Sequence, residues 1–274
     1  MTDKHAVLLI GAGSMGGAML KGWLKAGLLD PEKSAVVDPN LPEDLAAQAD
    51  GYGLSVNPVT DTSYDVCVIA VKPQLFPVVI PVLGWPDMAK TVYISIAAGK
   101  SIAATSLHLK EAGVEDASII RVMPNLPVAV GEGISLLYAE DSVSSLQRQI
   151  ATSLVEATGQ AIWVRSEAEI DTGMSISACG PAYVFLLVEA MEEAGITAGL
   201  APETAARLAR ETVIGASALM SEDQRAASSL REAVTSKGGT TAEALKVLDK
   251  ADGLRKLMSE AVQAATSRAQ ALRD

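Results

Sequence analysis

The sequence predicts an α/β protein in which a doubly wound parallel sheet is followed by a second part built of helices. Up to about residue 165, short apolar runs typical of buried strands alternate with segments of helical periodicity. Beyond that point only helical patterns remain. The 274 residues leave room for two modest domains. We therefore expect a sheet domain over 1–165 and a helical domain over 166–274.

The expected elements follow from these patterns in chain order. The expected strands cover 7–10, 35–37, 65–71, 91–97, 119–123 and 161–164, with a possible edge strand over 133–138. The expected helices are one that starts at the first glycines, then 42–48, 142–158, 183–193, 202–220, 230–234, 240–248 and 254–272. Pro181 suits a first helical turn and Gly195 a C-cap, so these two residues would bound the helix over 183–193.

A glycine-rich turn connects the first strand to the first helix. Gly11 allows the tight turn, Gly13 lets the backbone approach a pyrophosphate, and Gly16 lets the helix pack on the strand. Asp38 follows the second strand at the spacing that places a carboxylate on an adenosine ribose. This order predicts a Rossmann-type dinucleotide site. The alternatives are a glycine turn that binds nothing, and an export signal behind Lys4, although glycines interrupt its apolar stretch.

Other conspicuous loops also follow predicted strands. They are Asn57, Lys72-Pro73, the stretch 97–99 and Pro124-Asn125. Ligands of doubly wound sheets bind outside the carboxyl ends of the strands. We therefore expect these loops to surround the same site as the glycine turn.

Composition and charge exclude several classes of protein. The net charge of −11 argues against nucleic acid or an anionic membrane as a partner. No apolar run approaches the roughly 20 residues of a membrane span. Cys67 lies in a strand pattern, and with Cys179 it makes no disulfide framework, so we expect a cytoplasmic protein. His5 and His108 are isolated, and we expect no metal site.

The helix over 183–193 is apolar on most of its faces. Such a helix is buried all round. A helical domain of roughly 110 residues is too small to surround it well. We therefore expect a second copy of the chain to cover it.

A second stretch with chemical potential lies between two predicted helices, over 234–241. Gly238-Gly239 frees the backbone, and Thr240-Thr241 begins a helix for which Glu243 would complete a capping pattern. The N–H groups and hydroxyls of such a turn can hold a small carboxylate. The alternative is a well-capped turn with no ligand.

The order of motifs resembles the 1-pyrroline-5-carboxylate reductase family from end to end of the chain. The matching pieces are Ile10-Gly-Ala-Gly-Ser-Met-Gly16, Ala70-Val-Lys-Pro-Gln74, Ala97-Ala-Gly99, Met123-Pro-Asn125, Gly180-Pro-Ala-Tyr183 and Leu230-Arg-Glu-Ala-Val-Thr-Ser-Lys-Gly-Gly-Thr-Thr241. The last piece is the most specific, because few other Rossmann enzymes carry a comparable turn. The resemblance therefore favours a substrate site over a simple capped turn there.

This resemblance implies a Rossmann domain followed by a helical domain that forms homodimers or larger rings of dimers. It implies hydride transfer from NADH or NADPH to the C=N carbon of a cyclic imino acid. The implied cofactor residues are Gly11, Ala12, Gly13, Ser14, Met15, Gly16, Asp38, Asn57, Ala70, Val71, Lys72 and Pro73, with Ala97 and Ala98 near the nicotinamide. The implied substrate residues are Glu167, Ser236, Gly238, Gly239, Thr240 and Thr241, of which Thr241 and Ser236 are the candidate catalytic pair.

Three residues matter because they depart from the family pattern or set cofactor choice. Lys237 stands where the family usually has proline, and adds a positive charge near the expected carboxylate. Cys179 lies in a less serine- and glycine-rich stretch than usual, and we interpret it as a small space-filler rather than a reactive thiol. Asp38 would repel a 2′-phosphate, which favours NADH over NADPH.

Two other functions are compatible with parts of the chain. A related imine or β-hydroxyacid reductase shares the sheet domain, but typically places a lysine on the long helix, and 183–193 contains none. A regulator that binds the cofactor without turnover is the second alternative. The intact glycine turn and Thr240-Thr241 argue against it.

Overall fold

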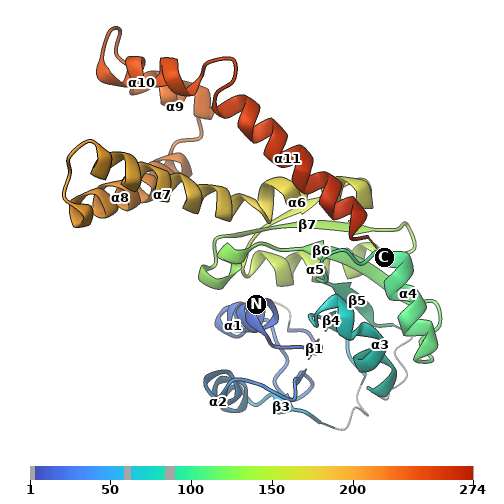
Figure 1. The fold of residues 1–274 in the computed structure, drawn as a ribbon. Helices are drawn as coiled ribbons and strands as arrows, with labels where there is room; N and C mark the ends of the chain where they lie inside the picture. Colours follow the sequence, from blue (N-terminus) through green and yellow to red (C-terminus); the bar gives the residue numbers. More distant parts are fainter. Residues whose placement is uncertain (1–3, 59–62, 84–89, 274) are drawn as a thin grey trace. The chain divides into compact units, whose positions relative to one another are not determined.

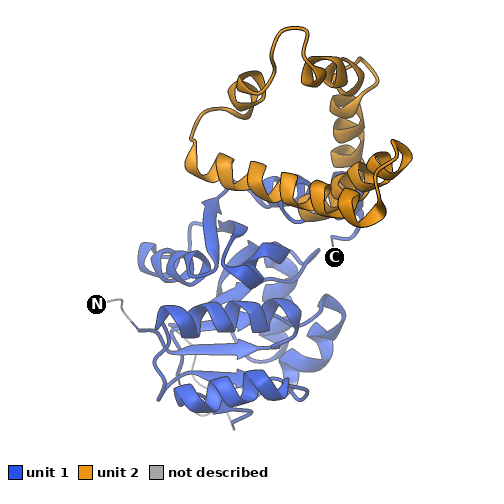
Figure 2. Ribbon diagram, turned by 90° about the vertical axis from the view of Figure 1, so that its left-hand side faces the viewer, with its two compact units in different colours: residues 1–178, 266–274 blue, residues 179–265 orange. Residues whose placement is uncertain are grey.

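The computed structural model describes residues 4–58, 63–83 and 90–273. The chain divides into two compact units (Figure 2): unit 1 contains 1–178 and 266–274, and unit 2 contains 179–265. The boundary between these units at 178/179 differs from the domain boundary at 165/166 that the sequence patterns predict. The domain boundary at 165/166 stays a prediction.

Unit 1 is built on one eight-stranded sheet of order β3-β2-β1-β4-β5-β6-β7-β8 (Figure 1). β1 pairs in parallel with β2 on one side and with β4 on the other, so the strand order reverses at β1. Ligands of doubly wound sheets bind at this kind of switch point. The predicted fold class is therefore confirmed. The strands are β1 Val7–Ile10, β2 Ala35–Val37, β3 Ser55–Val56, β4 Val66–Ile69, β5 Val92–Ser95, β6 Ser118–Met123, β7 Gly133–Ala139 and β8 Gly159–Trp163.

The possible edge strand over 133–138 was placed wrongly. β7 lies inside the sheet, antiparallel to β6 and parallel to β8, which forms the edge. Only the short 3₁₀ helix η3 (Leu126–Val130) separates β6 from β7. A parallel return needs a crossover of a dozen residues or more, so a connection this short gives an antiparallel pair.

Helices cover both faces of this sheet (Figure 1). One core joins the sheet to α1 (Ser14–Ala26), α2 (Glu43–Tyr52) and α5 (Ser145–Glu156). A second core on the opposite face includes residues of α3 (Phe76–Val79) and α4 (Ile102–Glu111). α6 (Glu167–Ser177) packs on β6 and β7. Cys67 is fully buried among these apolar side chains, as predicted, and burial raises the pKa of its thiol far above the usual range.

Unit 2 is helical. It contains α7 (Gly180–Thr197), α8 (Pro202–Glu222), α9 (Ala227–Ala233), α10 (Thr240–Leu248) and the start of α11 (Leu254–Ala271). The prediction that Gly195 caps α7 is wrong, because the helix continues to Thr197. A Cβ on Gly195 would lie 3.2 Å from the Cβ of Ala205, so this glycine serves the close packing of α7 on α8.

The surface of α7 is unusual for so apolar a helix. None of its residues is buried in the single chain, and Phe185 and Leu186 are 55% and 64% exposed. By length and composition the stretch Glu167–Thr197 could also cross a membrane, which corrects the expectation that no run is long enough. Small glycine, alanine and serine residues extend the apolar window beyond the strictly hydrophobic stretch.

The indole of Trp23 offers a test of the packing between α1 and α5. Its side chain is fully buried, and its Nε1–H donates to the carbonyl oxygen of Leu154 (2.8 Å). Trp23→Phe leaves that buried oxygen unpaired, which costs about 1–3 kcal/mol in addition to the lost volume. We expect urea denaturation to show a clear fall in the free energy of unfolding.

Trp163→Phe is the matched control. In the wild type, the Nε1–H of Trp163 donates to the hydroxyl of Thr152 at a partly exposed position, where water can replace this hydrogen bond. An equal loss of stability in both variants would contradict the importance of the buried Trp23 bond.

Candidate dinucleotide and substrate sites

The glycine turn lies at the carboxyl end of β1, between β2 and β4. The N–H of Gly11 donates to the carbonyl oxygen of Val37, and the N–H of Ala70 donates to that of Ile10, both at 2.8 Å. These bonds join the ends of three neighbouring strands. The structure thus brings the predicted cofactor residues Gly11 and Ala70 together.

The first and third glycines of the turn are required by close packing. Gly11 has φ +88°, and a Cβ there would lie 2.8 Å from Cγ1 of Val71. A Cβ on Gly16 would lie 2.2 Å from the carbonyl oxygen of Gly11 and 2.9 Å from the Cβ of Ala70. Contacts this short have no room for a side chain. Gly16 therefore brings the start of α1 directly onto the turn.

Gly13 differs from these two residues because a Cβ there would meet no atom within 4 Å. It is the N-cap of α1 and offers no side chain to cap the helix. The first N–H groups of a helix lack intrahelical acceptors and carry its positive dipole end. A neighbouring cavity of about 290 Å³ is lined by Ala12, Gly13, Ser14, Gly17, Ala18, Lys21, Pro42, Asp44, Leu45 and Ala129. Open space beside uncapped N–H groups fits an anionic group such as a pyrophosphate.

Asp38 holds the neighbouring loops in place. Its Oδ2 accepts from the N–H of Ala12 (2.7 Å), and its Oδ1 accepts from the N–H of Asn40 (2.8 Å). The side chain of Asn57 bridges the backbone of Asp38 through bonds of 2.8 and 3.0 Å. A negative charge is therefore fixed beside the glycine turn. Each carboxylate oxygen can accept a second bond, for example from a ribose hydroxyl.

The remaining predicted cofactor residues lie in the loops after β4 and β5. Lys72 is exposed and precedes the short helix η1 (Pro73–Leu75). Ala97 is buried, whereas the next residue, Ala98, is exposed. These loops follow parallel strands whose carboxyl ends meet at one edge of the sheet.

In unit 2, the predicted substrate turn starts α10 without a side-chain cap. Gly239 is the N-cap, and its N–H donates to the carbonyl oxygen of Ser236 (3.0 Å). The predicted capping role of Glu243 is wrong, because its carboxylate accepts from Nζ of Lys246 (2.6 Å). Gly239 has no side-chain oxygen to cap the helix, so the first N–H groups of α10, beginning with Thr240 and Thr241, face no side-chain acceptor of the N-cap. The turn can thus offer N–H groups and hydroxyls to an anion.

Glu167, the remaining predicted substrate residue, lies at the start of α6 in unit 1. Its Oε1 accepts from Nη1 of Arg121 (3.1 Å) and from the N–H of Ile102 (3.0 Å). Nη2 of Arg121 also donates to Oδ1 of Asp171 (2.8 Å). Sequence reasoning missed Arg121 and Asp171. The signal was a lone arginine within the apolar strand β6, which had to find carboxylates once buried.

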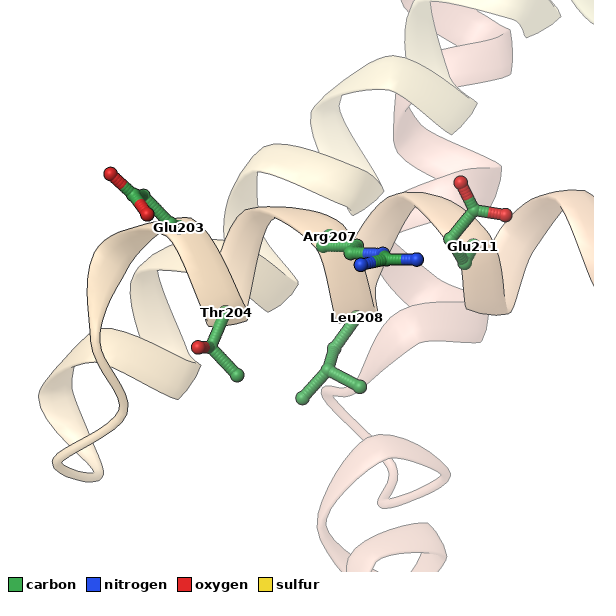
Figure 3. Close-up of a pocket in the computed structure, with 5 residues that line it drawn as sticks. All are labelled: Glu203, Thr204, Arg207, Leu208 and Glu211. Carbon is green, nitrogen blue, oxygen red and sulfur yellow. The ribbon is translucent and has the colours of Figure 1, made fainter.

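Unit 2 also has a hollow of about 570 Å³ along one helix. Its lining residues all come from α8 (Figure 3): Glu203, Thr204, Arg207, Leu208 and Glu211. None of the residues predicted for cofactor or substrate lines it. Leu208 is 54% exposed there, so none of the described residues covers its apolar side chain fully.

The sheet, its switch point and the open glycine turn define a Rossmann-type oxidoreductase. Residues 6–99 match the family described as NADP oxidoreductase, coenzyme F420-dependent, and residues 167–272 match the family described as pyrroline-5-carboxylate reductase dimerisation. The chain belongs to the pyrroline-5-carboxylate reductase family.

Curated relatives and solved structures support this membership. A pyrroline-5-carboxylate reductase of Haemophilus influenzae is 37% identical over 272 residues, which cover 96% of each chain. One of Pseudomonas aeruginosa is 35% identical and covers 96% of this chain and 94% of its own. The structure of such a reductase from Coxiella burnetii is 33% identical, with a TM-score of 0.88 over 99% of this chain and 100% of its own.

A glycine-to-alanine pair tests the packing of the turn. Gly16→Ala puts a methyl group against the Gly11 carbonyl oxygen, and overpacking of this kind costs about 1–3 kcal/mol. Gly13→Ala adds the same methyl group in open space at φ −64°, where any residue fits. We expect thermal unfolding to show a lower Tm for Gly16→Ala and a Tm near wild type for Gly13→Ala. Equal losses would contradict the different surroundings of the two glycines.

Proposed function

We propose that this protein reduces the C=N bond of 1-pyrroline-5-carboxylate to L-proline with NADH or NADPH, the last step of proline biosynthesis. The single observation that carries this proposal is the full-length similarity to named reductases, 37% identical over 96% of the chain. The uncapped glycine turn and the uncapped start of α10 add a site of matching chemistry in each unit. A related reductase from Plasmodium falciparum, 25% identical with a TM-score of 0.80, has a structure with NADP bound.

The cofactor fits the glycine turn of unit 1. The N–H groups at the start of α1 would hold the pyrophosphate beside Gly13, and Asp38 would accept the hydroxyls of the adenosine ribose. The loops that follow β4 and β5 would support the rest of the molecule, with Lys72-Pro73 along it and Ala97-Ala98 near the nicotinamide. When bound, the reduced nicotinamide supplies the hydride, and the protein supplies position.

The substrate carboxylate fits the turn of unit 2. Ser236, Gly238, Gly239 and Thr240 would hold it through backbone N–H groups and hydroxyls, aided by the exposed charge of Lys237. Thr241 would orient the ring nitrogen through its hydroxyl. A protonated imine accepts hydride far more readily than a neutral one, so the ring reacts as an iminium and Thr241 need not supply a proton.

The protein acts as a homodimer or a larger ring of dimers. Residues 167–272 match a dimerisation family, and this range contains the exposed apolar surface of α7. A second copy would bury Phe185 and Leu186, which no part of the described chain covers. Burial against a partner also explains why a helix apolar enough for a membrane belongs to a cytoplasmic enzyme.

The reaction is tested by following the oxidation of NADH and NADPH side by side with 1-pyrroline-5-carboxylate, and by identifying proline in the product. We expect turnover, with NADH giving the higher kcat/KM. Turnover only with other cyclic imines or β-hydroxyacids would support a related reductase. Tight NADH binding without any turnover would support the regulator.

Asp38 sets the preference between the two cofactors. Asp38→Asn keeps an oxygen for the N–H of Ala12 but removes the charge that repels a 2′-phosphate. Charges about 4 Å apart in a water-exposed site interact by roughly 1 kcal/mol or more, so we expect the NADPH/NADH ratio of kcat/KM to rise about tenfold. Asp50→Asn is the control, because that carboxylate is exposed on α2 and does not line the cavity beside the glycine turn. An unchanged ratio in Asp38→Asn would refute the role of its charge.

Thr241 is tested by removal of its hydroxyl. Thr241→Val keeps the shape of the side chain, and a lost hydrogen bond to a charged group costs about 1.5–3 kcal/mol. We expect kcat/KM for the imino acid to fall roughly 10- to 100-fold. Thr172→Val, on the exposed side of α6, should leave it unchanged. Wild-type kinetics in Thr241→Val would remove this residue from the site.

A further inference from the structure

Four charged side chains of unit 1 form a cluster whose centre is buried: Arg121 and Asp171 lie inside, and the partly exposed Glu167 and Arg273 pair with them. Arg121 and Asp171 are 2% and 1% exposed, although both carry charge. Each ion in such a place needs a partner, because an unpaired buried charge is strongly destabilising. The cluster contains two cations and two anions, and its charges therefore balance. Packing alone does not require charged groups here, so their placement needs another explanation.

Glu167 connects this cluster to the start of α4. The same oxygen that accepts from Arg121 also accepts from the N–H of Ile102, the first residue of α4. That N–H has no acceptor within its own helix. The N-cap Ser101 serves a different amide, that of Ala104 (3.0 Å). Glu167 thus fixes the position where α4 begins, three residues beyond Gly99.

Arg273 connects the cluster to the end of the chain. Its Nη2 forms an ion pair with Oδ2 of Asp171. Leu272, the residue before Arg273, packs on the loop that contains Gly99. A Cβ on Gly99 would lie 2.8 Å from the carbonyl oxygen of Leu272. Earlier on α11, Oγ1 of Thr266 is 3.2 Å from Oγ of Ser175. The stretch 266–273, which contains the end of α11 and the two residues after it, is therefore anchored to α6 and to Gly99.

We propose that this cluster is a positioning device for the loop over 97–99. Arg121 orients Glu167, which holds the end of the loop through Ile102. Asp171 holds Arg273, which keeps Leu272 on Gly99. Both contacts hold the side of the loop that leads into α4, and the exposed residue Ala98 just before them is presented in one conformation. Resting on the proposed function, this makes the four residues positioning residues for the nicotinamide end of the cofactor.

The proposal gives Glu167 a role other than direct substrate binding. A carboxylate that contacts the imino acid would set the KM for that substrate. A carboxylate that holds Ile102 would set the order of the loop, and through it kcat and the KM for NADH. Glutamine keeps an oxygen for the Ile102 N–H, whereas alanine does not. The pair Glu167→Gln and Glu167→Ala therefore separates the two roles.

The first test is amide hydrogen exchange on the protein without cofactor, read in peptides over 96–104. We expect Glu167→Ala to speed exchange of the Ile102 amide about tenfold or more, and Glu167→Gln to restore most of the protection. Arg273→Gln should speed exchange at Gly99 and Lys100. Glu169→Gln and Arg268→Gln are the matched controls. The Glu169 carboxylate pairs with the exposed Arg165 on the surface, and Arg268 is exposed, so both variants should show the exchange rates of the wild type.

Unchanged exchange in Glu167→Ala and Arg273→Gln would overturn the proposal, whether or not the protein reduces an imine. Exchange that rises over the whole chain, with a lower Tm, would also overturn it, because the cluster would then serve general stability.

The second test is steady-state kinetics with the active protein. We expect Glu167→Ala to lower kcat or raise the KM for NADH about tenfold, with the KM for the imino acid within about twofold of wild type. Glu167→Gln should recover most of this loss. A large rise of the imino-acid KM in Glu167→Gln would overturn positioning in favour of substrate contact. Absence of turnover in wild type would refute the proposed function alone, since hydrogen exchange tests the cluster independently.

Discussion

The approach of Gly16 to the carbonyl oxygen of Gly11 is the contact on which the candidate site depends. It leaves no room for a Cβ on Gly16 and brings the first turn of α1 onto the end of β1. As a result, the uncapped N–H groups of α1 point at the edge where β1, β2 and β4 end together. Asp38 fixes the other side of the turn through Ala12. One packing constraint therefore creates both the positive helix end and the space beside Gly13.

The starts of two other helices also determine what can bind there, although the groups that they offer differ from those of α1. The start of α10 also lacks a side-chain cap, and Glu243 turns away to Lys246. The start of α4 is different because Glu167 supplies a carboxylate to Ile102. Helix starts without a side-chain cap can take a ligand, whereas a helix start that is bound by a carboxylate from another helix can fix a loop.

Much of this could be predicted from the sequence because it depends on local patterns. The glycine turn, the alternation of strands and helices, and the bounds of α10 follow from residues close together in the chain. The sequence did not predict that β8, rather than β7, forms the edge of the sheet, because the pairing partners of a strand are not a local property. The cap at Gly195 was wrong because its contact with Ala205 is a tertiary one. In a helical pattern, a lone glycine is compatible both with the end of the helix and with a close contact between two helices.

The buried cluster shows most clearly what sequence alone could not supply. Arg121 signals its own burial, but its partners lie 46 and 50 residues further along the chain. Arg273 is further still, two residues beyond the end of α11. No local sequence pattern connects these positions, so the hydrogen bond from the Ile102 N–H to Glu167 becomes visible only in the fold. The exposed apolar face of α7 likewise becomes visible only in the fold, and it lies within the residues that match the dimerisation family.

Hydride transfer from a nicotinamide to the C=N carbon of 1-pyrroline-5-carboxylate is the activity that we propose for this chain. The most direct measurement is the reaction with NADH that carries deuterium on the transferring face of C4, followed by mass spectrometry and NMR of the product. We expect proline with one deuterium on the ring carbon that is bonded to nitrogen and does not carry the carboxylate. Unlabelled proline, deuterium at another carbon, or no proline at all would contradict the account.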